Sequence, residues 1–495
     1  MSEEKTPFFE TSFNRAVKIR SRDDRLTSDA GVLLLREADH RLGLVESLGE
    51  NLYDPRDPTK IRYGLTELLR ERVYSLIQGY AVADDVDLLA HDPVVRMATW
   101  DRPGDRVLDE RLASQPTQSR LIDTLANTKS NLEALRGSLS DWIGRFLKTT
   151  GKDRQVARAT IDIDGFPVTA RGLQEGSQYN GHYQKRVFYP LVAGFAPEGT
   201  YDSTRAGDGI VHAILRRGAA SGADGALRFI RNAVKRGRTL ARSVDVRFDA
   251  AFAVGKIMDP LTDDGIKFVG RISSNKALER LAEPYVWRRP GRPPKEGYEY
   301  VVELDSYKAE GWRHAQRIIL VVVDKPHPKT GQLELFPFYF FLVTNRREDE
   351  RSASEMLFHY RRRGTFEDRI GELSQAIAVH LSSPRFEENE VNLLLSLLAF
   401  NFLSMLRGEA ERAFESGWDL GRFQRTVLKV GARVVKQGRR LFVDIAQAAR
   451  PIWQRLIRRI SRWSVPSSWA QPRGPTKRRW TPPPRHAHLT MVLRH

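Results

Sequence analysis

The stretch VARATIDIDGF, residues 156–166, marks the point where the chain changes from helical to mixed structure. Two isoleucines alternate with Asp162 and Asp164, which is the period-two pattern of a half-buried β-strand. Both carboxylates therefore share one face of the predicted strand, and Gly165 ends it. The isoleucines occupy the opposite face, which predicts a strand that packs on a core by one side only.

The segments around this strand predict an α/β domain. Residues 28 to about 150 have helical periodicity, so we expect a helical N-terminal region over 1–150. Apolar strand patterns follow at FYPLVAGF (188–195), VDVRF (244–248) and GIKFVGRI (265–272), with helical stretches expected at 209–215 and 224–236. These segments, 151–284, form the first part of the expected mixed-sheet core.

A β-rich block interrupts this core. Between Pro/Gly clusters lie the strand patterns YEYVVELDSY (298–307), RIILVVVDK (317–325) and FPFYFFLVT (336–344). Helical periodicity resumes at Ser352, so we expect the second part of the core at 346–420. The block at 285–345 is then an insertion, and we expect a subdomain beside the core and outside its central sheet.

The composition points to a polyanionic partner and excludes several kinds of chemistry. The 495 residues include 80 Lys and Arg against 62 Asp and Glu, a net charge of +18. Nucleic acid is the first candidate for such an excess. The absence of cysteine excludes disulfides, thiolate zinc sites, iron–sulfur clusters and a cysteine nucleophile. A catalytic metal would need carboxylate ligands, which favour Mg²⁺ or Mn²⁺.

Nearly all of the excess charge lies at the C-terminus. From Gly421 onward, 18 Lys and Arg face a single acid, Asp444. We expect basic amphipathic helices over 421–463 and a disordered Pro/Arg-rich tail over 464–495. The candidate DNA contacts here are Arg439, Arg440, Lys477, Arg478 and Arg479. The alternatives are a solvated tail that contacts nothing, or basic helices on a membrane surface.

The stretch DERLASQPTQSRLIDTLAN, residues 109–127, has the outline of a helix-turn-helix. A short helix would stop at Ala113, and a second would begin after Ser114 as N-cap. Three residues would then read base edges from the start of the second helix: Thr117, Gln118 and Arg120. This makes 1–150 the expected DNA-binding region. Plain packing of a helical hairpin is the alternative.

Acidic residues at strand ends are the candidate metal ligands. Asp164 ends one strand, and Asp249 follows the strand at 244–248. In HYRRRGTFEDRIGEL (359–373), helical spacing places Tyr360, Arg363 and Glu367 on one face. Spacing alone leaves open that these are solvated acids and an exposed Arg363–Glu367 pair.

Taken together, these residues resemble a family. The Tyr-x₂-Arg-x₃-Glu pattern at 360–367 is similar to the glutamate motif of DDE transposases of bacterial insertion sequences, in the cut-and-paste branch with a β-strand insertion. Further similar stretches occur in the same order along the chain: LASQPTQSRL (112–121), IDIDGFPVTARGLQEGSQYNGHY (161–183), RFDAAFAVG (247–255) and LKVGARVVKQGRRL (428–441).

The resemblance implies a ribonuclease H-like core in which Asp164, Asp249 and Glu367 form an acidic triad that binds Mg²⁺ or Mn²⁺. Asp164 is favoured over Asp162 because the second acid of the Asp-x-Asp strand is the family's usual ligand. The resemblance gives Arg363 the role of orienting Glu367 or contacting a phosphate. It gives Tyr360 a stacking or hydrogen-bonding role at the DNA end.

The implied partner is double-stranded DNA, both the inverted-repeat ends of an insertion sequence and a target, with a homodimer on the DNA. We expect a cytoplasmic protein at the bacterial nucleoid and no membrane span, because polar residues interrupt the apolar stretch 391–406. Two departures from the family pattern keep alternatives open. Ala250 and Ala251 follow the second aspartate, and Ser374 replaces the lysine seven residues past Glu367. The alternatives are a nuclease without strand transfer and a catalytically dead DNA-binding relative.

Overall fold

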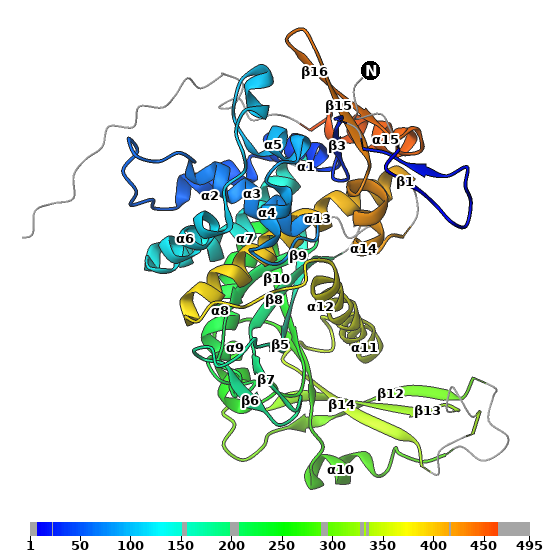
Figure 1. Ribbon diagram of the computed structural model, residues 1–495. Coiled ribbons are helices and arrows are strands. Elements are labelled where there is room, and N and C mark those ends of the chain that lie inside the picture. The colour runs from blue at the N-terminus through cyan, green and yellow to red at the C-terminus, as the bar shows by residue number, and fades with distance from the viewer. Residues whose placement is uncertain are drawn as a thin grey trace, which may run out of the picture.

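The computed structural model describes residues 7–21, 23–150, 156–198, 207–288, 296–326, 331–332, 336–414 and 417–463. Helices and strands mix along this part of the chain, with a large mixed sheet in the middle (Figure 1). The α/β class expected from the sequence is therefore confirmed.

The central sheet has eight strands in the order β12-β13-β14-β11-β10-β4-β8-β9. Its first five strands in the chain are β4 (Val156–Gly165), β8 (Leu191–Pro197), β9 (Gly209–Ile214), β10 (Ala241–Phe248) and β11 (Phe268–Ile272). Strands β4, β8 and β9 are antiparallel neighbours, while β10 runs parallel to both β4 and β11. The parallel connections pass through α8 (Ala226–Leu240) and α9 (Gly255–Asp263). This arrangement is compatible with the expected ribonuclease H-like core.

One helix expected in this core is a strand. The stretch 209–215, predicted as helical, forms β9, whose first five residues are buried. Helix α7 (Lys129–Thr149) and α13 (Phe386–Phe414) both contact this strand. A short apolar run that is covered on both faces has no polar alternation, so its periodicity does not distinguish strand from helix.

The inserted strands extend the central sheet, so the expected separate subdomain is wrong. Strand β14 (Phe338–Thr344) pairs antiparallel with β11, and β13 (Gln316–Asp324) and β12 (Tyr298–Tyr307) follow outward (Figure 1). Without this pairing β11 would be an edge strand with unpaired backbone groups. Strand β13 is apolar on both faces: Ile318 and Leu320 join the main core, and Ile319 and Val321 join a second cluster under α11 (Ala353–Arg361).

The N-terminal helices pack around one long helix. They are α1 (Val32–Leu42), α2 (Leu44–Asn51), α3 (Leu65–Ile77), α4 (Asp85–Leu89), α5 (Pro93–Thr99), α6 (Gln115–Ala126) and α7, with the 3-10 helix η2 (Gly104–Leu108). Helix α13 contacts α3, α6 and α7, and its Asn401 side chain bonds both backbone groups of Ile210 on β9. Among the described helices, α13 has the length and hydropathy of a membrane span, but its apolar window is fully buried in the protein. It is the core helix expected at 391–406.

The N- and C-terminal regions share a three-stranded sheet, β16-β15-β3. Strand β3 (Arg25–Thr27) pairs with β15 (Ala432–Gln437), which forms a hairpin with β16 (Arg440–Ile445). The short strands β1 (Phe9–Glu10) and β2 (Lys18–Ile19) also pair. The helical prediction for 28 to about 150 is confirmed, but the residues before it form strands, so the 1–150 region is not entirely helical.

The expectation that 421–463 is entirely helical is wrong as well. After α14 (Leu420–Phe423) and a π-helical turn, Gln424–Leu428, comes the β15–β16 hairpin, and only then η4 (Gln447–Ala449) and the basic helix α15 (Arg450–Ile460). Gly438 begins the hairpin turn with φ 59°, the left-handed value that a type II′ turn requires of its first central residue. The predicted tail, 464–495, lies outside the described residues.

Candidate active site

The two aspartates of β4 have different surroundings. Asp162 is 2% exposed, and both of its carboxylate oxygens accept bonds from Arg247, at 2.5 Å from Nε and 2.7 Å from Nη2. Arg247 also donates to the backbone carbonyl of His359 on α11. Burial raises the pKa of Asp162, and Arg247 opposes that rise. Asp162 is therefore one half of a buried ion pair that ties β4 and β10 to α11.

Asp164 lies at the open end of the same strand, where its side chain is 16% exposed. Its Oδ1 accepts from the backbone N–H of Gly165 at 2.8 Å, and its Oδ2 accepts from Nη2 of Arg363 at 2.8 Å. Burial raises the pKa of Asp164 to about 6 against the pull of Arg363, and the charges of Asp249 and Glu367 add to the rise. The three predicted ligands thus act on one another electrostatically.

Arg363 is the centre of this group. It lies between α11 and α12 (Gly364–Ala376), and its guanidinium bonds both Asp164 and Glu367. Burial alone would lower the pKa of Arg363, but the charges of Asp164, Glu367 and Asp249 outweigh it and raise that pKa. Tyr360 is half-buried beside the group, and burial raises the pKa of its hydroxyl. The structure therefore brings together the residues of the Tyr-x₂-Arg-x₃-Glu motif and the two strand-end aspartates.

Local packing explains how these side chains reach their places. Asp249 follows β10 and accepts from the backbone N–H of Ala251 at 2.9 Å, which turns the chain at the strand end. Helix α11 begins after Ser352, whose side chain forms a reciprocal capping box with Glu355. Phe366 fixes α12 on the sheet, because its ring fills the space that a Cβ at Gly194 of β8 would need. In Figure 1 both helices lie together beside the sheet.

The donor chemistry of this group fits Mg²⁺ or Mn²⁺. Arg363 bridges the carboxylates of Asp164 and Glu367, and the charge of Asp249 acts on the same guanidinium. Hard divalent cations prefer such oxygen ligands. Arg363 holds Asp164 and Glu367 through bonds that a bound cation would have to replace. Within the described residues, Asp164, Asp249 and Glu367 do not form a group whose ligand atoms all lie within 4.8 Å of one another.

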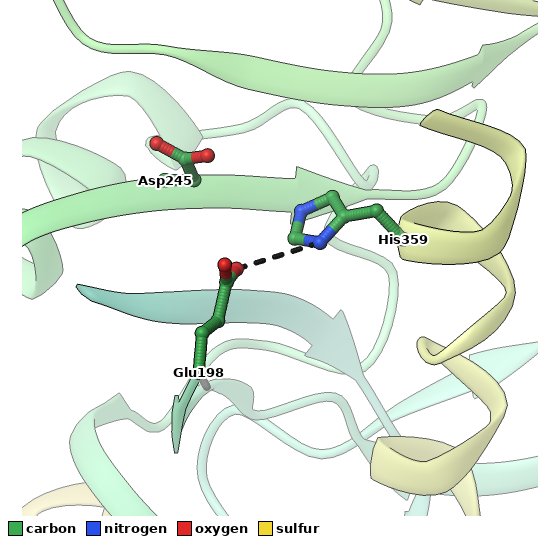
Figure 2. Close-up of side chains that lie close together, drawn as sticks. All are labelled: Glu198, Asp245 and His359. Carbon is green, nitrogen blue, oxygen red and sulfur yellow. Dashed lines mark ion pairs between the residues drawn. The ribbon is translucent and has the colours of Figure 1, made fainter. Parts of the chain in front are cut away.

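Such a group lies elsewhere, at Glu198, Asp245 and His359 (Figure 2). His359 Nδ1 is 3.4 Å from Glu198 Oε1, and burial lowers the pKa of His359 to about 3. The carboxylates already have cationic partners: Arg346 binds Asp245 at 2.5 and 2.9 Å, and Arg351 binds Glu198 at 3.1 Å. A cation here would compete with two arginines, so this cluster fits a metal less well than the group around Arg363.

The predicted recognition helix is packed into the protein. Gln118 is 1% exposed, and its Nε2 donates to the backbone carbonyl of Leu68 at 3.4 Å. A side chain this deeply buried is not available to base edges, so its assignment to base reading is wrong. Residues 109–114 are not helical, so the first helix of the predicted helix-turn-helix is missing as well. Arg120 is exposed and Thr117 half-buried, and the two are joined by a bond of 3.2 Å.

Of the five predicted C-terminal DNA contacts, two lie in the described part of the chain. Arg439 and Arg440 are exposed at the turn of the β15–β16 hairpin. Lys477, Arg478 and Arg479 lie outside the described residues.

Comparison with protein families decides the identity. The family model described as "Transposase DDE domain group 1" matches residues 9–464, which is nearly the whole chain. The chain belongs to this family. A search of curated proteins found no match.

Membership of the DDE transposase family confirms the resemblance drawn from the sequence and indicates an enzyme that acts on DNA with a divalent metal. Sequence reasoning missed Arg247 as the partner of Asp162. Its only sequence signal is its position between the apolar Val246 and Phe248, where a strand buried on both faces would place a hydrophobic residue.

Proposed function

We propose that this DDE transposase binds the ends of an insertion sequence and catalyses phosphodiester hydrolysis and strand transfer, with Asp164, Asp249 and Glu367 as its catalytic triad. One observation carries the assignment of the site. Residues 164, 249 and 367 are far apart in the sequence, yet all three carboxylates act on Arg363, and two of them bond to it.

The three carboxylates would hold Mg²⁺ or Mn²⁺. When bound, the cations lower the pKa of the attacking water and offset the charge that develops at the phosphorus. Arg363 keeps the carboxylates together before metal and DNA arrive, and its guanidinium is then available to a DNA phosphate. Tyr360, half-buried beside it, contributes an aromatic face and a hydroxyl. The same site serves hydrolysis and strand transfer, because only the nucleophile changes between water and a 3′-hydroxyl.

The DNA would contact several surfaces besides the catalytic site. Arg120 and Thr117 offer a polar contact on α6, and Arg439 and Arg440 offer charges at the tip of a hairpin. The tail residues Lys477, Arg478 and Arg479 add further positive charge. We propose that the protein acts as a homodimer on inverted-repeat ends and target DNA, in the cytoplasm at the bacterial nucleoid.

The test uses DNA that carries the terminal repeats flanking the gene. Asp164→Asn, Asp249→Asn and Glu367→Gln should each abolish Mn²⁺-dependent cleavage of the ends while leaving their affinity for the protein nearly unchanged. Asp368→Asn is the matched control, because Asp368 is an exposed acid next to Glu367 on the same helix. Cleavage at wild-type rate by the Asp164→Asn protein would refute the assignment.

A supercoiled plasmid target separates transposase from nuclease. Joined products indicate strand transfer, whereas cut ends without joining indicate a nuclease. One observation favours the alternative of a catalytically dead DNA-binding relative. Ser374, at the family's lysine position, donates its hydroxyl hydrogen to the backbone carbonyl of Ile370 at 3.0 Å. Binding without cleavage in Mn²⁺ would support that alternative.

A further inference from the structure

A column of aromatic rings leads from the β6–β7 hairpin to Asp164. The hairpin joins β6 (Gln178–Asn180) to β7 (Lys185–Phe188), in a small sheet with β5 (Val168–Thr169). The ring of His182 meets Tyr183 edge-on at 4.7 Å between centroids, and Tyr183 lies 6.1 Å from Tyr189 at an angle of 35°. His182 is exposed and Tyr183 half-buried, so the outer end of the column is open to solvent.

The inner end of the column touches the residue after Asp164. A Cβ built on Gly165 would lie 2.8 Å from Cε1 of Tyr189, so the tyrosine ring covers the Gly165 backbone closely. Burial raises the pKa of the Tyr189 hydroxyl, and Tyr183 and the charge of the Asp164 carboxylate add to the rise. Tyr189 is therefore an immediate neighbour of the proposed metal ligand.

Arg216 fixes this arrangement from behind. Its guanidinium lies 5.3 Å from the centre of the Tyr189 ring, and its Nε donates to the Tyr189 carbonyl at 3.1 Å. Arg216 is 7% exposed, and its Nη1 bonds backbone carbonyls of the loop Ser221–Asp224. A buried arginine with this many bonds holds the Tyr189 ring rigidly beside the site.

The hairpin itself is held in place and is positively charged. Asn180 donates to the Gly218 carbonyl at 3.0 Å, and its Oδ1 accepts from the His182 backbone N–H at 3.1 Å. Lys185 and Arg186 are exposed on β7. Aromatic rings at the surface beside cationic side chains are a usual means of holding a nucleotide, since a ring can stack on the nucleobase while the cations attract the phosphates.

We propose that Tyr183, flanked by His182 and supported by Tyr189, stacks on the base of the DNA nucleotide next to the scissile phosphate and so positions that phosphate at Asp164. This inference rests on the proposed function. Neither Tyr183 nor Tyr189 is among the proposed metal ligands, so Tyr183 is a positioning residue whose effect depends on the presence of the base.

The experiment is a double-mutant cycle in which one change is made in the protein and the other in the DNA. The Tyr183→Ala variant and the full-length wild-type protein are each tested on end DNA with either a normal or an abasic nucleotide beside the cleavage point. Affinity is measured in EDTA, where metal-dependent cleavage does not run, and the cleavage rate is measured separately in Mn²⁺. Tyr183→Ala should weaken binding of the normal end by about tenfold, the scale of one lost base stack. On the abasic end the same variant should have little effect, because the stacking partner is already gone.

Two further variants keep the result specific. Tyr183→Phe retains the ring and should bind as the wild type does, while Tyr179→Ala removes a tyrosine of the same hairpin that is 63% exposed and should change neither measurement. Equal losses on normal and abasic ends, or an equal loss in Tyr179→Ala, would overturn the inference. If Tyr183→Ala weakens binding only of the normal end, but the wild-type protein cleaves neither end, the result would contradict the proposed function and still support the stacking role.

Discussion

At the scale of single residues, two aspartates on one strand face lie in different surroundings because their partners differ. Asp162 is neutralised by Arg247 in the interior, while Asp164 reaches the open end and meets Arg363. The alternating pattern predicts the shared face correctly. It cannot predict the difference in surroundings, because Arg247 and Arg363 come from segments far along the chain, and only the sheet register brings Arg247 opposite Asp162.

Removing Arg247 should cost far more stability than removing an exposed arginine. Arg247→Ala leaves Asp162 buried without its cation, and breaking a buried pair in this way typically costs about 3–5 kcal/mol. It also removes the bond to the His359 carbonyl, which helps to fix α11 and the glutamate helix. Urea or thermal unfolding measures the loss. Arg231→Ala is the control, because its pair with Asp264 is exposed, and a change of equal size there would contradict the argument.

Glu71 should make stability depend on pH in an unusual direction. Burial raises the pKa of its carboxyl from 4.5 to about 8, so the folded protein keeps a proton that the unfolded chain releases. Its contribution to stability is therefore fullest below pH 4.5 and falls as the pH rises toward 8.

Glu71→Gln should remove this dependence, because an amide can still accept from the backbone N–H of Ala113. At pH 7 we expect a gain on the order of 2 kcal/mol over the wild type, shrinking toward zero below pH 5. Melting curves across this pH range provide the measurement. The control Glu133→Gln changes an acid that is 59% exposed and should leave the profile unchanged. A gain that stays constant with pH would show that titration is not its cause.

At the scale of elements, sequence patterns predict strands whose polar and apolar residues alternate, and fail where that alternation is absent. The strands around Asp164 and Asp249 were predicted from their alternation, and β4 and β10 confirm them. The expectation that the Asp162 strand packs by one side only is wrong, because its polar face is also buried, with Asp162 paired to Arg247. Strand β9 was taken for a helix because its residues are almost all buried. The hairpin at 432–445 was missed for a different reason: its bases fall among apolar residues at spacings that also suit an amphipathic helix, and the turn at Gly438 decides the outcome.

The fit between β8 and α12 gives a prediction at this scale. A Cβ at Gly194 would lie 2.2 Å from the Phe366 ring, so Gly194→Ala should push α12 away from the sheet and move Glu367 relative to Asp164. We expect at least a tenfold loss of cleavage with DNA affinity retained, because a misplacement of about 1 Å at a catalytic group has effects of that order.

Gly371→Ala is the matched control on the same helix, since nothing lies within 4 Å of the Cβ it would add. That change should leave cleavage intact and raise stability by up to about 1 kcal/mol through helix propensity. Full activity in Gly194→Ala would show that the position of α12 does not depend on this contact.

At the scale of the whole molecule, the two ends of the chain fold together although the charge is concentrated at one of them. Strand β3 pairs with β15, Lys429 binds the buried Asp29 at 2.6 Å, and α15 packs against α1 and α13. Composition predicted where the charge lies but not this pairing, because two-residue and three-residue strands have no sequence pattern of their own. The basic C-terminal region is thus attached to the helical layer and continues into the tail.

Salt dependence should reveal how this charge is used. Each phosphate that the protein neutralises adds about −0.9 to the slope of log K against log salt concentration. Deleting residues 464–495 removes six Lys and Arg and should flatten the slope by several units if the tail follows the DNA backbone. Replacing Arg439 and Arg440 by alanine should flatten it by at most about two units.

Preference for the terminal repeats over random DNA should survive both changes, because phosphate contacts carry no sequence information. Lys60→Ala, which removes an 83% exposed cation from the N-terminal region, controls for charge alone. If the deletion leaves the slope unchanged, the charges of the tail face solvent and do not contact DNA phosphates.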